Sequence, residues 1–123
     1  DTALREIRSG RKRSHWMWYI FPQIAGLGMS YTAQLYAIKD IEEARQYIAH
    51  PVLGAHLIEI SNALLTLDCS DAAAVMGYPD DLKLRSCMTL FAQVSDDPVF
   101  DAVLAKFYGG MADARTLELL SLT

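Results

Sequence analysis

The stretch "VLGAHLIEISNALLTL", residues 52–67, decides the fold class. Its large aliphatic side chains recur at intervals of four, three, four and three residues, which is the spacing of one face of an α-helix. The members of this stripe are Leu53, Leu57, Ile60, Leu64 and Leu67. Pro51 suits the first position of the helix, because proline lacks the N–H that would have no partner there. We therefore predict a long amphipathic helix at the centre of the core, with the first four members of the stripe buried.

Signals that start and end helices recur on both sides of this stretch. The residues expected to cap or open helices are Ser14, Ser30, Asp40, Ser70, Pro79, Asp97 and Asp113. A first helix is expected over residues 2–9, and no segment shows the sustained period of two that marks a strand. The pattern predicts an all-α protein in which residues 1–123 form one compact domain of about six to eight short-to-medium helices.

Length and composition are those of a folded domain. Of 123 residues, 52% are hydrophobic and 21% are charged, which argues against disorder. The longest apolar run, residues 16–21, is too short to cross a bilayer, so we expect no membrane association. No secretory signal is visible, and we expect a cytoplasmic protein. The sequence opens on Asp1 rather than methionine, which leaves room for a preceding N-terminal segment.

Motifs for metals, disulfides and cofactors are missing from the sequence. Cys69 and Cys87 stand alone, without a CxxC pair or a nearby histidine, so we expect two free thiols and no metal site. Neither a GxSxG sequence, a Walker loop nor an HExxH motif occurs, and we expect no cofactor.

The net charge of −4 is unevenly distributed along the chain. Residues 1–15 contain five arginine and lysine side chains and two carboxylates, so this end is basic and the remainder is acidic. A basic end on an acidic body suits a local anion site. Nucleic acid is an improbable partner, because phosphate backbones require an extended positive surface.

The segment "KRSHWMWYIFPQ", residues 12–23, is the first candidate site. Trp16 and Trp18 are two residues apart, so on a helix their side chains diverge by about 200°. We expect one indole in the core and the other, together with His15, to line a concave surface. Aromatic faces beside cations suit nucleobases, and an imidazole can donate to a phosphate or transfer a proton. The alternative is that both tryptophans simply pack in the core.

The segment "YPDDLKLRS", residues 78–86, is the second candidate site. We expect Lys83 or Arg85 to extend from this helix toward the cationic and aromatic segment and to form part of an anion clamp. The aspartates at the start of the helix argue against a bare phosphate cradle there. The alternative for Arg85 is an ion pair with Asp81, four residues earlier on the helix.

Four segments in order, "GRKRSHWMWYIFPQIAGLG", "YAI", "HPVLG" and "PDDLKLRSCMTLF", resemble DUF1810, a bacterial family of unknown function often mislabelled "calpastatin" in genomes. The resemblance runs over essentially all 123 residues. It implies a small cytoplasmic, mainly α-helical domain, and it supplies no catalytic residues. The calpastatin label has no support in this sequence, because that inhibitor resembles disordered chains of low hydrophobicity.

The sequence thus favours a domain that binds an anionic or nucleotide-like small molecule. The residues expected to line its site are Arg11, Arg13, His15, Trp16, Trp18, Gln23, Lys83 and Arg85. For an enzyme, we expect a hydrolytic reaction with His15 or Asp80 transferring protons. The alternative is a protein-interaction module without catalytic activity, whose exposed aromatic side chains contact a partner helix or a second copy. Catalytic residues and oligomeric state stay open.

Overall fold

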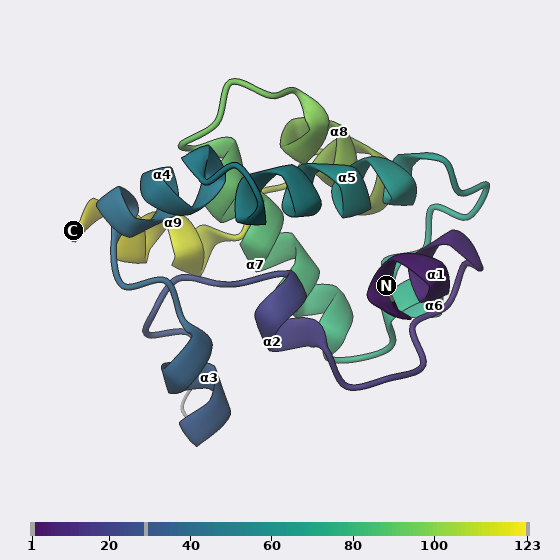
Figure 1. The fold of residues 1–123 in the computed structure, drawn as a ribbon, viewed down its shortest axis with the longest axis horizontal. Helices are drawn as coiled ribbons and strands as arrows, with labels where there is room; N and C mark the ends of the chain where they lie inside the picture. Colours follow the sequence, from purple (N-terminus) through teal and green to yellow (C-terminus); the bar gives the residue numbers. More distant parts are fainter. Residues whose placement is uncertain (1, 29, 123) are drawn as a thin grey trace.

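Nine helices form within residues 2–28 and 30–122, the part of the chain that the computed structural model describes (Figure 1). In chain order they are α1 (Thr2–Arg8), α2 (Met17–Ile20), α3 (Tyr31–Tyr36), α4 (Ile41–Ala49), α5 (Leu53–Leu65), α6 (Ala72–Met76), α7 (Asp80–Ala92), α8 (Val99–Tyr108) and α9 (Ala114–Ser121). Six of them have at least seven residues. The prediction of one all-α domain is confirmed, and the short α2, α3 and α6 account for the larger number of helices.

Helix α7 forms the centre of the core, where it packs against α4, α6, α8 and α9. Residues 86–91 are buried without interruption, so this part of α7 has no face in solvent. The ring centroid of Phe91 lies 5.5 Å from that of Tyr47 and 5.8 Å from that of Phe100. The expectation that residues 52–67 provide the central helix is therefore wrong. Helix α5 packs on α1, α4 and α8 and runs across the upper part of Figure 1.

The hydrophobic stripe on α5 points inward along most of its length. Leu57, Ile60 and Leu64 are buried, whereas Leu53 keeps 44% of its surface exposed, which corrects the prediction for that residue. The reason is that α5 begins only at Leu53 and not at the proline before it. The imidazole Nδ1 of His50 accepts the backbone N–H groups of Val52 and Leu53, each at 3.1 Å, in the turn that leads into α5.

Helices α4 and α5 meet closely at a bend of 84°. At Gly54 a Cβ atom would lie 2.1 Å from the carbonyl oxygen of Ile48, so only glycine fits between the two helices. Among the described residues no single helix is long and apolar enough to cross a membrane, and only this bent pair reaches the required length and composition.

Side-chain caps start several helices as expected. Asp40 accepts the N–H of Glu43 at 2.9 Å at the start of α4, and Ser30 and Asp113 likewise cap α3 and α9. Two of the predicted caps are wrong. Asp71 rather than Ser70 caps α6, and Ser14 makes no capping bond to α2, because its hydroxyl is bound to a carboxylate of α1.

The two cysteines are both free, as predicted. Cys69 is exposed in the connection between α5 and α6, and Cys87 is completely buried in α7. Burial raises the pKa of the Cys87 thiol well above its ordinary value. Cys87 therefore stays protonated and acts as a small apolar core residue.

Leu57 and Leu53 form a matched pair for a test of the α5 orientation. We expect Leu57→Ala to lower the free energy of unfolding by about 2–5 kcal/mol, because it leaves a cavity in the core. The same change at the exposed Leu53 should lower it by less than about 1 kcal/mol. Urea unfolding followed by circular dichroism measures both values. Similar losses in the two variants would contradict the orientation described for α5.

Candidate functional site

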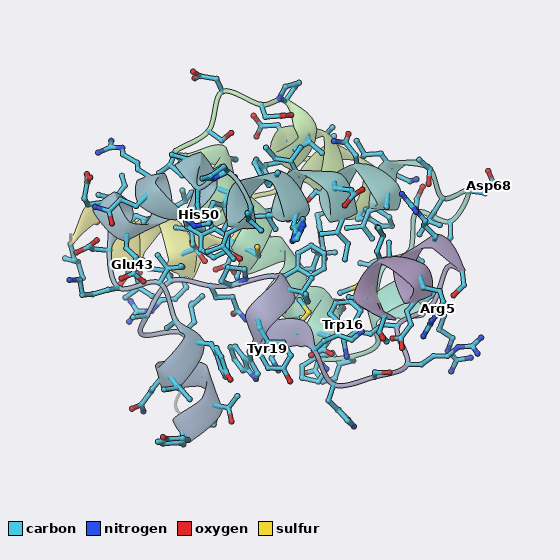
Figure 2. All side chains as sticks on the ribbon, viewed as in Figure 1. Arg5, Trp16, Tyr19, Glu43, His50 and Asp68 are labelled. Carbon is cyan, nitrogen blue, oxygen red and sulfur yellow. The ribbon has the colours of Figure 1, made fainter. Side chains whose placement is uncertain are left out.

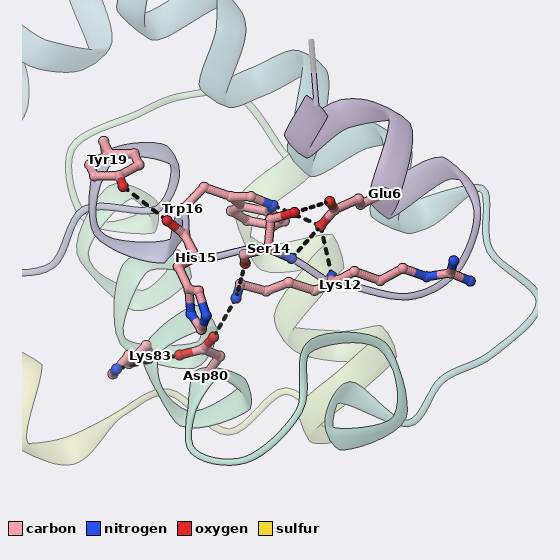
Figure 3. A network of polar contacts seen from close by, with 9 residues as sticks. Glu6, Lys12, Ser14, His15, Trp16, Tyr19, Asp80 and Lys83 are labelled. Carbon is pink, nitrogen blue, oxygen red and sulfur yellow. Dashed lines mark hydrogen bonds and ion pairs between the residues drawn. The ribbon is translucent and has the colours of Figure 1, made fainter.

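The site begins with a carboxylate on α1. Glu6 is only 8% exposed and lies between Ala3 and Ile7, which are both buried on the inner face of this short helix. The chain turns back after α1, so that residues 11–16 pass in front of the Glu6 side chain (Figure 3). The backbone N–H of Lys12 donates to the carbonyl oxygen of Val75 at 2.7 Å and ties this loop to α6.

Four hydrogen bonds converge on the two oxygens of Glu6. Its Oε1 accepts the backbone N–H of Arg13 at 2.7 Å, that of Ser14 at 2.9 Å and the indole N–H of Trp16 at 2.9 Å. Its Oε2 accepts the hydroxyl of Ser14 at 2.5 Å. These bonds, with the Ser14 hydroxyl contributing most and the Arg13 N–H next, outweigh the opposing effect of burial and lower the pKa of Glu6 from 4.5 to about 2.

This network separates the two tryptophans. Trp16 is held by Glu6 and is 6% exposed, with its ring centroid 6.0 Å from that of Phe21 (Figure 2). Trp18 is half-buried and lies at the surface of α2. The divergence expected from their spacing is confirmed. Tyr19 lies on the side of α2 that faces α3, and its hydroxyl donates to the backbone carbonyl of His15 at 2.9 Å.

A hollow of about 210 Å³ lies between α2, α3 and the start of α7. We call it the basic hollow. Its lining consists of Lys12, His15, Met17, Trp18, Tyr19, Thr32, Asp80 and Lys83. His15 is exposed, and its imidazole extends toward the side on which Asp80 and Lys83 lie (Figure 3).

Asp80 joins two lysine ammonium groups at the floor of the basic hollow. The Nζ atom of Lys12 lies 2.8 Å from one Asp80 oxygen, and the Nζ atom of Lys83 lies 3.3 Å from the other. The Lys12 ammonium also donates to the carbonyl oxygen of Ser14 at 2.6 Å. The Lys83 ammonium lies over the indole of Trp18, 4.5 Å from the ring centroid. One face of Trp18 is therefore already covered by a cation, and a flat ligand has to use the remaining indole surface.

A second hollow of about 220 Å³ adjoins the first, and Trp18 and Lys83 line both. We call it the Gln23 hollow. Its lining consists of Trp18, Gln23, Leu27, Gly28, Pro79, Leu82, Lys83 and Ser86. A backbone bridge fixes this wall. The backbone carbonyl oxygen of Gln23 accepts the N–H of Ile38 at 2.7 Å, and the backbone N–H of Ala25 donates to the carbonyl oxygen of Ile38 at 2.8 Å.

The predicted site residues divide into three groups. The structure brings His15, Trp18, Gln23 and Lys83 together around the two hollows. Trp16 is buried beneath them. The three arginines of the predicted set, Arg11, Arg13 and Arg85, line neither hollow.

Each position has a structural reason. The backbone N–H of Arg13 donates to the Glu6 carboxylate, and Arg13 borders a separate hollow beside α1. Arg11 is exposed to solvent. Arg85 points to the other side of α7, where its guanidinium donates to the carbonyl oxygens of Met111 and Ala112 at 2.9 and 2.8 Å. It fastens the α8–α9 connection instead of pairing with Asp81.

Sequence reasoning missed the roles of Glu6 and Lys12. A signal for Glu6 was present. It shares the inner face of α1 with Ala3 and Ile7, and apart from Asp1 it is the only carboxylate among the arginines of residues 1–15. Lys12 begins the first candidate segment, but no local pattern pointed to its contact with Asp80, which lies far away in the sequence.

The charged side chains that line the basic hollow are two lysines and one aspartate. Among the described residues no three His, Cys, Asp or Glu side chains gather closely enough to hold a metal ion. His15 and Asp80, the two expected proton-transfer groups, both line the basic hollow. A fourth hollow, between α1, α2, α4 and α5, is lined mainly by apolar side chains and has no lysine or arginine in its lining.

The sequence matches the family described as "Protein of unknown function (DUF1810)" over residues 1–120. The chain belongs to this family. Its fold is similar to the crystal structure of the conserved hypothetical protein Rv1873 from Mycobacterium tuberculosis, with a TM-score of 0.95 and 47% sequence identity. That similarity covers 98% of this chain and 87% of the other. No curated protein matches the sequence. The DUF1810 relationship expected from the motifs is confirmed, and it assigns no activity.

The Glu6 network makes stability depend on acid pH. Because folding lowers the pKa of Glu6 from 4.5 to about 2, the carboxylate contributes its full stabilisation above pH 4.5 and loses it as the pH falls toward 2. We expect Glu6→Gln to be less stable than the wild type at pH 7, and the difference should shrink steadily below pH 4.5. Urea unfolding at a series of pH values measures it. A difference that stays constant down to pH 2.5 would contradict the role assigned to the carboxylate.

Proposed function

We propose that this DUF1810 domain binds a small molecule through an anionic group, phosphate or carboxylate, in the basic hollow. The observation that carries the proposal is the pair of ammonium groups that Asp80 holds beside Trp18 and His15. With two lysines and one aspartate in its lining, the hollow has an excess of one positive charge when His15 is neutral. An anion there gains charge-assisted hydrogen bonds, which are about twice as strong as neutral ones.

The lysines keep hydrogen-bond capacity for a ligand. Each ammonium group has three donors. Within the described residues, Lys12 uses its donors on Ser14 and Asp80, whereas Lys83 has Asp80 as its hydrogen-bonding partner. One donor on Lys12 and two on Lys83 are therefore available to oxygens of a ligand.

The site is also ordered before a ligand arrives. The Lys12 side chain is only 8% exposed, and it is fixed by its two oxygen partners and by the Trp16 ring, whose centroid is 5.0 Å from the ammonium nitrogen. Immobilising a free lysine side chain on binding costs about 0.5–1.5 kcal/mol. The Lys12 side chain is already fixed in the folded protein, so ligand binding avoids this cost there.

The rival function, a protein-interaction module, has one observation in its favour. Helix α3 projects from the body of the molecule in Figure 1 and exposes Tyr31, Leu35 and Tyr36. Nothing in the described part of the chain indicates what would cover this surface. The basic hollow, in contrast, specifies the charge of its occupant, and we favour ligand binding on that ground.

Lys83 and Lys39 provide a matched pair for the test. In a thermal-shift screen with inorganic phosphate, ribose 5-phosphate and simple carboxylates, a ligand at a hundred times its Kd adds about 2.7 kcal/mol of stability. We expect a raised Tm with at least one of these anions. Lys83→Met should weaken that ligand by about tenfold or more, because it loses a charge-assisted bond.

Lys39→Met is the control, since the Lys39 side chain is 78% exposed and lies outside the basic hollow. Its affinity for the anion should match that of the wild type. The proposal is wrong if no anion in the screen binds, or if both lysine variants lose affinity equally.

A further inference from the structure

One residue that lines the Gln23 hollow has a buried polar group without a partner. Gln23 is 5% exposed, and its amide nitrogen Nε2 has no hydrogen-bond partner in the described residues. A buried donor left unpaired costs about 1–3 kcal/mol, so native proteins rarely retain one without a use. The neighbouring Ser86 hydroxyl donates to the Leu82 carbonyl at 3.1 Å, and it makes no hydrogen bond with Nε2 of Gln23.

The remaining walls of the hollow suit a flat apolar group. Leu27, Pro79 and Leu82 present aliphatic surface, and Trp18 adds the edge of an indole. Gly28 allows its backbone to pack closely against Ala33 and Trp18, since a Cβ atom at this position would lie 2.6 Å from the Cβ of Ala33 and 3.2 Å from the Trp18 ring. The hollow thus combines apolar walls with the unpaired amide of Gln23.

Trp18 and Lys83 connect this hollow to the basic one. Both residues line the two hollows, and the Lys83 ammonium lies over the indole at their junction. The separate volumes, about 210 and 220 Å³, are small, but together they reach the range of about 300–1,000 Å³ found for small-molecule sites.

We propose that the ligand of this domain carries a planar heterocycle of the nucleobase class, which occupies the Gln23 hollow while its anionic end occupies the basic hollow. The amide of Gln23 donates to a carbonyl oxygen or ring nitrogen at the edge of the heterocycle. Leu27, Pro79 and Leu82 contact its faces, and Lys83 binds the anionic group. This proposal rests on the proposed function, because it assigns the second half of the same ligand.

The test compares nucleotides with a ligand that lacks the base. Isothermal titration calorimetry gives the Kd of the wild type for adenosine, guanosine, cytidine and uridine monophosphates and for ribose 5-phosphate. We expect at least one nucleotide to bind about tenfold tighter than ribose 5-phosphate. Gln23→Met should reduce this preference to within about twofold and leave the affinity for ribose 5-phosphate unchanged.

The stability of Gln23→Met separates a binding role from a structural one. Because Nε2 of Gln23 bonds to nothing in the described residues, its removal should leave the Tm unchanged or raise it. Leu82→Ala is a second variant, since Leu82 is 47% exposed and its replacement does not endanger the core. It should also weaken the preference for the nucleotide. Leu35→Ala is the control, because this side chain on α3 is 58% exposed, and it should leave the preference for the nucleotide unchanged.

The outcomes distinguish this proposal from the one before it. If ribose 5-phosphate binds and no nucleotide is preferred, the basic hollow stands as an anion site and the Gln23 assignment is wrong. If Gln23→Met lowers the Tm and keeps the nucleotide preference, Gln23 is a structural residue, and the assignment is again wrong. If neither ribose 5-phosphate nor any nucleotide binds, the Gln23 assignment is wrong, and the proposed function fails as well if inorganic phosphate and the simple carboxylates also do not bind.

Discussion

A single buried carboxylate, that of Glu6, determines the path of the chain at the candidate site. It accepts the N–H groups of Arg13 and Ser14, the Ser14 hydroxyl and the Trp16 indole N–H. Without it, the two backbone N–H groups and the buried indole N–H would lose their acceptor, which is unfavourable. The negative charge on Glu6 makes all four bonds stronger than neutral ones would be. The loop geometry is therefore set by electrostatics and not by packing alone.

The position of Lys12 follows from this loop. Once its backbone is fixed to Val75 and its neighbour Arg13 to Glu6, its side chain passes over Trp16 and reaches Asp80 at the start of α7. Asp80 then holds Lys83 on the opposite side. Two carboxylates thus act in sequence: Glu6 places the loop, and Asp80 places the two ammonium groups. Both contacts determine where the charged groups of the basic hollow lie, and the proposed ligand binding depends on those groups.

The sequence predicted some parts of this structure and not others, for identifiable reasons. The apolar stripe on α5 can be recognised in the sequence because the other side of that helix faces solvent and is polar. Helix α7 is buried on all sides over residues 86–91, so its sequence there shows no apolar face distinct from a polar one. Lys83 and Arg85 are two residues apart, so they had to point in different directions, but only the tertiary packing of α7 decides which one faces α2. The contact between Lys12 and Asp80 joins residues far apart in sequence, and no local pattern encodes it.

The central claim is that an ionised Glu6 holds the loop, and an NMR pH titration tests it most directly. The side-chain carboxyl carbon of Glu6 and the indole N–H of Trp16 are followed together as the pH is lowered. The account predicts that both signals change with one shared midpoint near pH 2, because the same hydrogen bonds stabilise the carboxylate and hold the indole. A Glu6 midpoint near 4.5, or an indole proton that does not respond when Glu6 is protonated, would contradict it.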